Sequence, residues 1–208
     1  MKLILCDTNT TLCKEWEALF AQEKNVEVVN ARFEDVEEYD CLVSPANSFG
    51  IMDGGMDAAI IKYFGPSLAK NVRIRIAYEF CNEQPVGTSI IVPTDNKKHP
   101  WLAHTPTMRV PQNIQGTDNV YNAMRAMLIA VQKGTTLWDI KEEPPYQMYA
   151  RRYVISSVLC PGLGTCTGQM TEADAAWQMY CAWRNTMYPY KVTWEKAYGI
   201  DRAIRGKP

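Results

Sequence analysis

The chain has 208 residues, of which 47% are hydrophobic and 22% are charged, and its net charge is −1. This balance is typical of a globular domain with a sizeable core, and it excludes the strongly basic composition of most nucleic-acid-binding proteins. No apolar run approaches membrane-spanning length and the apolar N-terminus is too short for a signal peptide, so we expect a cytoplasmic location, no membrane partner and no specific nucleic-acid partner.

The hydrophobic pattern predicts strands and helices that alternate along the chain. Short apolar runs rich in β-branched residues predict strands at 2–6, 26–30, 41–45, 89–94, 101–105 and 153–162. Amphipathic runs predict helices at 10–23, 56–64, 67–81, 117–134 and 171–183. This order indicates an α/β fold, namely a three-layer α/β/α domain with a mixed, largely parallel central sheet.

The chain shows no internal repeat and no linker long enough to divide it, so we predict one domain over residues 1–208. A polar, proline-containing segment at 135–150 precedes the last core strand and is interpreted as an insertion. The tail at 189–208 ends in a basic segment with glycine and proline, and we expect it to fray.

Cysteine and histidine are not spaced as metal ligands. The seven cysteines form no C-x-x-C pair, and the only histidines are His99 and His104. We therefore predict no metal and no cofactor, and we expect reduced, mostly buried thiols.

Two glycine-containing segments follow predicted strands and precede predicted helices: CLVSPANSFGIMDGGMDAAI at 41–60 and LCPGLGTCTGQM at 159–170. In open α/β sheets, ligands bind at the carboxyl ends of strands, where such loops gather. Glycine lets the backbone approach a phosphate, and a helix N-terminus offers free N–H groups to an anion. The spacing matches neither the dinucleotide fingerprint, nor a P-loop, nor a G-x-S-x-G elbow. The residues alone thus indicate two anion-binding loops, with Asn47 and Asp57 as a candidate side-chain pair.

The run SPANSFGIMDGGMDAAI resembles the first signature of the macro domain family, and CPGLGTCTG resembles that family's second loop. The order of strands, loops and helices also agrees, and the resemblance covers residues 26–185. The resemblance implies a macro-type α/β/α fold that binds ADP-ribose, and some members of the family hydrolyse ADP-ribose from proteins or small esters.

The resemblance also implies roles for individual residues. Asn47 would hydrogen-bond the distal ribose, and Asp57 matches the acid that, in hydrolytic members, positions or activates the attacking water. Gly54 and Gly55 would let the first loop close over the diphosphate and that ribose. The remaining implied ligand contacts come from both loops: Ala46, Met56, Gly162, Leu163, Gly164, Thr165, Cys166, Thr167 and Gly168.

Several positions depart from the family pattern, which makes the chain resemble a divergent member. The acid that holds the adenine amino group in many members falls, by spacing, near Phe33 and Glu34. Glu34 or Asp35 would then replace it, or Phe33 would stack on the base. Met52 and Asp53 stand where the family has glycines, and they add bulk and a negative charge to the first loop.

The activity that the resemblance implies is hydrolysis at the distal ribose of an ADP-ribosyl ester, an O-acyl-ADP-ribose or ADP-ribose 1″-phosphate. Two other functions stay open: a non-catalytic ADP-ribose reader and a degenerate macro-like interaction module. Two simpler roles stay open as well, because Asn47 can be a turn residue that bonds its own backbone and Asp57 an ordinary acid in a first helical turn.

Overall fold

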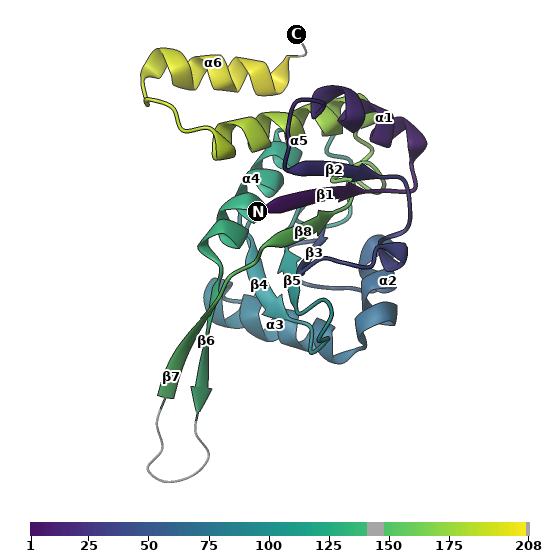
Figure 1. Ribbon diagram of the computed structural model, residues 1–208, viewed down its shortest axis with the longest axis vertical. Helices are drawn as coiled ribbons and strands as arrows, with labels where there is room; N and C mark the ends of the chain where they lie inside the picture. Colours follow the sequence, from purple (N-terminus) through teal and green to yellow (C-terminus); the bar gives the residue numbers. More distant parts are fainter. Residues whose placement is uncertain (141–147, 207–208) are drawn as a thin grey trace.

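A computed structural model describes residues 1–140 and 148–206, and its centre is a six-stranded sheet in the order β2-β1-β8-β3-β5-β4 (Figure 1). The strands are β1 (Lys2–Cys6), β2 (Val26–Val29), β3 (Cys41–Ser44), β4 (Ile90–Pro93), β5 (Trp101–His104) and β8 (Ser157–Cys160). Neighbouring strands are parallel except for β4, which runs antiparallel to β5. The predicted mixed, largely parallel sheet is confirmed.

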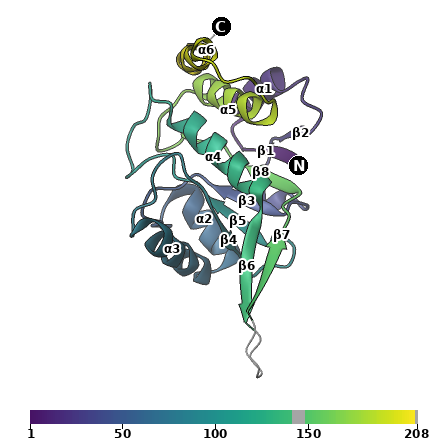
Figure 2. The ribbon, with the colours of Figure 1, turned by 90° about the vertical axis from the view of Figure 1, so that its left-hand side faces the viewer.

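Helices cover both faces of the sheet, which gives the predicted three layers (Figures 1 and 2). One face is covered by α1 (Thr10–Leu19), α4 (Asn119–Lys133) and α5 (Glu172–Met187). The other face is covered by α2 (Gly55–Phe64) and α3 (Ser67–Phe80). None of the helices in the described ranges combines the length and the apolar composition that crossing a membrane would take.

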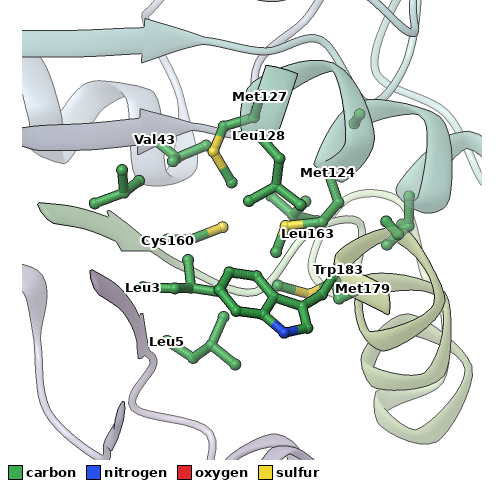
Figure 3. Packing of buried hydrophobic residues seen from close by; sticks show 14 of the residues in the cluster. Leu3, Leu5, Val43, Met124, Met127, Leu128, Cys160, Leu163, Met179 and Trp183 are labelled. Atoms are coloured by element: carbon green, nitrogen blue, oxygen red, sulfur yellow. The ribbon is translucent and has the colours of Figure 1, made fainter. Parts of the chain in front are cut away.

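The central strands are apolar on both faces because side chains alternate along a strand. In β1, Leu3 and Leu5 pack with α1, α4 and α5, whereas Ile4 packs on the side of α2 and α3. Figure 3 shows Leu3, Leu5 and other side chains of the first cluster around Trp183 and Met179 of α5. The short continuous apolar runs in the sequence are thus strands buried between two helical layers.

The predicted strand at 153–162 is interrupted. The structure instead ends β7 (Met148–Tyr153) and begins β8 four residues later, with Val154 78% exposed between them. The Asp40 carboxylate accepts hydrogen bonds from Ser156 N at 2.7 Å and Ser157 N at 2.9 Å, which fixes the start of β8. This long-range contact has no signature in the local sequence.

The segment at 135–150 begins with β6 (Thr135–Ile140) and includes the start of β7, and these two strands form an antiparallel ribbon of their own. The ribbon extends away from the layered body of the protein (Figure 1). The rest of the predicted insertion, residues 141–147, lies outside the described residues.

The C-terminal segment does not fray throughout, because residues Trp194–Arg205 form helix α6. The Thr193 side chain accepts a hydrogen bond from Lys196 N at 3.1 Å, as an N-cap does. Ile204 is buried, and the Trp177 indole N–H of α5 donates to Ala203 O at 2.7 Å. Capping and docking on α5 together outweigh the basic, glycine-containing composition.

Burial on both faces makes the central strands sensitive to loss of side-chain volume. Leu42 in β3 is 0% exposed, so Leu42→Ala is expected to lower the free energy of unfolding by about 2–5 kcal/mol. Urea denaturation measures this change. The matched control is Ile74→Ala on α3, where the side chain is 54% exposed and the expected change is within about 0.5 kcal/mol. Equal losses in both variants would contradict the described core.

Candidate functional site

The carboxyl ends of the parallel strands lie at one edge of the sheet, which we call the carboxyl edge. Three loops leave it: loop 1 (45–54, after β3), the middle loop (105–118, after β5) and loop 2 (161–171, after β8). Ala46 N of loop 1 donates to Thr105 O at 3.2 Å. Ile114 N of the middle loop donates to Gly168 O at 2.9 Å. The middle loop therefore joins the two segments that the sequence singled out.

Asn47 holds loop 1 in shape with its own side chain. Its Oδ1 accepts hydrogen bonds from Phe49 N at 3.0 Å and Ile51 N at 3.3 Å, and its Nδ2 donates to Ile51 O at 2.7 Å. This is the turn role that the sequence left open. Because an amide nitrogen carries two hydrogens, one donor remains for a ligand hydroxyl.

Loop 1 passes into α2 through two glycines. Gly55 has a φ of +52°, a conformation that favours glycine, and a Cβ at Gly54 or Gly55 would meet nothing within 4 Å. No side chain caps the start of α2 among the described residues. The first N–H groups of α2 therefore have no side-chain acceptor, while Met56 is partly buried against the core under α2 and α3.

Asp57 is a buried carboxylate at the start of α2. Its side chain is buried, and Ser44 Oγ at the end of β3 donates a hydrogen bond to Asp57 Oδ1 at 2.5 Å. Burial raises the pKa of Asp57 to about 6, the hydrogen bond from Ser44 opposes this rise, and the negative charge of Asp53 adds to it. A carboxyl group with such a pKa can exchange a proton near neutral pH, as a general base must.

A second buried polar side chain lies next to Ser44. His104 occupies the position on β5 that pairs with Ser44 on β3. Its Nδ1 lies 2.8 Å from Gln84 Oε1, and burial lowers its pKa to about 3, so the imidazole is neutral. His104 is therefore a poor proton acceptor for a thiol, and burial also raises the pKa of Cys160. The buried Cys160 thiol is a poor nucleophile, as expected of a structural cysteine.

The base of loop 2 is packed tightly against its neighbours. Gly164 has a φ of +76°, and a Cβ there would lie 2.7 Å from Val120 Cγ2. Gly162 N donates to Asp7 Oδ2 at 3.0 Å, so this N–H is already used within the protein. The Leu163 side chain is fully buried in the core. These residues shape loop 2 from below.

The tip of loop 2 is the part that faces solvent. Thr165 is half-buried, and Cys166 and Thr167 are exposed. Among the described residues, no hydrogen-bond acceptor is found for the backbone N–H of Thr165, Cys166 or Thr167. An anion at the carboxyl edge would find its free N–H donors here and at the start of α2.

Three further polar residues at the carboxyl edge, Asp7, Asn9 and Ser44, belong to neither predicted loop motif. Asp7 follows β1 and accepts hydrogen bonds from Gly162 N and, at 2.9 Å, from Asn9 N. Asn9 caps α1 and donates to Glu172 Oε1 at 3.0 Å. The position of Asp7 after the first strand was the available signal, because the carboxyl ends of parallel strands meet at one edge.

The residues proposed to recognise adenine lie after β2, on the short 3₁₀ turn η1 (Phe33–Asp35). Phe33 is 5% exposed, and its ring packs edge-on against Tyr63 with centroids 5.6 Å apart. Glu34 is half-buried. The turn therefore exposes the Glu34 side chain more than the Phe33 ring.

In residues 1–140 and 148–206, no cluster of three or more His, Cys, Asp or Glu side chains suited to a metal ion is found.

Comparison with family models identifies one family. The family model described as Macro domain matches residues 43–179. An uncharacterized protein of Aquifex aeolicus (strain VF5) is 30% identical over 152 residues, which span 73% of this chain and 76% of that protein.

Two solved structures share the fold. A mutant of the Oceanobacillus iheyensis macrodomain, solved with ADPR, has a TM-score of 0.54 and 19% identity and covers 80% of this chain and 84% of its own. The macrodomain of Mycobacterium tuberculosis DarG has a TM-score of 0.52 and 15% identity, with 74% and 86% covered.

The raised pKa of Asp57 predicts a pH-dependent stability. The folded chain keeps a proton on Asp57 that the unfolded chain releases, so ionised Asp57 lowers stability as pH rises from about 4 to about 6. We expect Asp57→Asn to gain roughly 2–3 kcal/mol over the wild type between about pH 4 and pH 7. Urea denaturation at both pH values measures this. Asp53→Asn, at an exposed position, should show a smaller change, and a pH-independent difference for Asp57→Asn would contradict its buried ionisation.

Proposed function

Because the chain belongs to the macro domain family, we propose that it binds ADP-ribose or a close derivative at the carboxyl edge and hydrolyses a bond at the distal ribose. The observation that carries the proposal is a buried carboxylate with a raised pKa, Asp57, at the glycine-rich start of α2. The solved macrodomain with ADPR supports the choice of ligand.

The ligand is proposed to lie between loop 1 and the tip of loop 2. A diphosphate needs unhindered N–H donors, and the tip residues Thr165–Thr167 and the start of α2 supply them. The distal ribose would accept the remaining Nδ2 hydrogen of Asn47. The adenine would lie toward η1, where Glu34 is the candidate acceptor for its amino group.

The proposed reaction uses Asp57 as a general base. Ser44 holds Oδ1, which leaves Oδ2 to accept a proton from water. For an ADP-ribosyl ester, the water oxygen bonds to the anomeric carbon as the bond to the ester oxygen breaks. The leaving oxygen keeps the electron pair, and the proton on Asp57 returns to solvent. O-acyl-ADP-ribose and ADP-ribose 1″-phosphate are the other substrates of this class.

A non-catalytic ADP-ribose reader is the second candidate. It is favoured by the small exposure of Asp57, 8%, and by the use of the Asn47 side chain within loop 1. Both features suit a structural acid and a structural amide as well as a reactive pair.

Binding is tested first by calorimetric titration with ADP-ribose, with ADP and ribose 5-phosphate as controls. We expect ADP-ribose to bind most tightly, because it alone presents both the diphosphate and the distal ribose. Absence of binding by all three ligands would overturn the proposed ligand and favour an interaction module. Equal affinity for ADP-ribose and ADP would remove the distal ribose from the proposed site.

Catalysis is tested with Asp57→Ala. If Asp57 acts on the attacking water, the variant should lose about 10²–10⁴-fold in turnover of an ADP-ribosylated substrate while its affinity for ADP-ribose changes little. Asp53→Ala, in loop 1 but exposed, is the matched control and should keep turnover within a few-fold. Binding by the wild type without any turnover would establish the reader instead, and equal loss of binding and turnover in Asp57→Ala would refute the assigned role.

A further inference from the structure

A groove of about 760 Å³ lies between α5 and α6, and it has no part in the function proposed above. Its lining includes the aromatic side chains Trp177 and Tyr180 and three basic side chains, Arg184, Lys196 and Arg202. This volume falls within the range of known ligand pockets. Figure 1 shows α6 as an outer helix lying along α5.

Near its C-terminal end, α6 packs closely on α5. There Trp177 Nε1 donates to Ala203 O at 2.7 Å, and Ile204 is buried. Glu195 and Lys196, at the other end of α6, also line the groove. The groove therefore lies along the side of α6 where this helix docks on α5.

Positive charge is concentrated around this groove. Residues 184–206, the described part of the C-terminal segment, contain five basic and two acidic residues, although the whole chain has a net charge of −1. Of the two acids, Glu195 lines the groove and Asp201 pairs with Arg205 at 3.2 Å. The net charge of the whole chain does not reveal this local excess of basic residues, because acidic residues elsewhere in the chain offset it.

Exposed aromatic rings accompany the positive charge. Trp194 is 80% exposed, Tyr198 63%, Tyr188 48% and Tyr190 37%. Trp194 and Tyr198 lie one turn apart on α6, with ring centroids 6.0 Å apart. We call these four residues the aromatic rim; they lie beside the groove and are not part of its lining. They are a large share of the exposed large apolar side chains among the described residues, and such a concentration marks an interaction surface.

Basic side chains already lie over rings of the rim. The Arg184 guanidinium lies 4.6 Å from the centroid of the Tyr188 ring, and Lys196 Nζ lies 5.5 Å from that of Tyr190. Arg184 also lies 3.5 Å from the Glu23 carboxylate, and its side chain remains 49% exposed. Two basic side chains of the groove lining thus lie against rings of the rim, so positive charge and aromatic surface are neighbours, as in sites that bind phosphates and bases together.

We propose that the groove and the aromatic rim bind single-stranded nucleic acid. Arg184, Lys196 and Arg202 would contact backbone phosphates, and the rim would stack against bases. Stacking of this kind tolerates any sequence, because every base has a π-face. A strand fits this surface better than a duplex does, since the bases of a duplex are already stacked on one another.

A membrane surface fits these residues less well. Helices that lie in a membrane interface present aliphatic and aromatic side chains together on one face. In α6, Ile204 is buried and Ile200 is packed against the core, so its aliphatic residues point toward α5. The outward residues of α6 are Trp194 and Tyr198, together with charged side chains.

The test is fluorescence anisotropy of the full chain with a labelled oligothymidylate of about 15 nucleotides, the upper range of site sizes for single-strand binding modules. We expect saturable binding that weakens with salt, with a log–log slope of about −2 for three phosphate contacts. The double variant Trp194→Ala, Tyr198→Ala should bind at least about tenfold more weakly. Lys196→Gln with Arg202→Gln should reduce the salt slope.

The matched control is Tyr78→Ala on α3, where the ring is 87% exposed but lies on the opposite helical layer, and it should bind like the wild type. Circular dichroism and urea denaturation verify that each variant keeps its fold. No binding at low salt, or equal binding by the rim variant and the wild type, would overturn the proposal. Binding to phosphatidylserine vesicles but not to the oligonucleotide would overturn it in favour of a membrane surface. These readouts do not depend on hydrolysis, so a negative result here would leave the function proposed for the carboxyl edge unaffected.

Discussion

Strands β1, β8, β3 and β5 bury apolar side chains against helices on both faces, so little polar chemistry fits within the sheet and most of it collects where the strands end. Since these strands are parallel, their carboxyl ends meet along one edge. Loop 1, the middle loop and loop 2 must then satisfy their backbone groups there with few regular partners. The site is a consequence of this requirement.

Two side chains meet part of this requirement, one from outside the loops and one from loop 1 itself. The Asp7 carboxylate occupies the N–H of Gly162, and the Asn47 amide occupies the backbone of loop 1. These bonds fix the bases of the loops and leave free donors at the tip of loop 2 and at the start of α2. Fixed loops with free N–H groups would offer an anion a site that is ordered before the ligand arrives, so less ordering entropy would be lost on binding.

Within the part of the chain that the structure describes, Asp57 is the buried carboxylate at this edge, and it lies beside the uncapped start of α2. Burial destabilises its charged form, and the hydrogen bond from Ser44 returns part of that loss. The same balance that lowers the stability of the fold near neutral pH leaves a carboxyl group able to exchange a proton there. Stability and proposed chemistry are thus opposed at one residue, as is common in functional sites.

The sequence by itself determined the layered α/β fold, the main strands and helices, and the two glycine-containing loops with Asn47 and Asp57 between strand and helix. These features follow from local causes: side-chain periodicity, capping and turn chemistry act over a few residues and can be read directly. Only the tertiary structure decided the partners of those residues. The Asp7 carboxylate bonds to Gly162 N, 155 positions away along the chain, and Asp40 bonds to the start of β8 from more than a hundred positions away. Helix α6 docks on α5 through the bond from Trp177 to Ala203. Contacts over such distances depend on how the layers pack, and no local pattern encodes them.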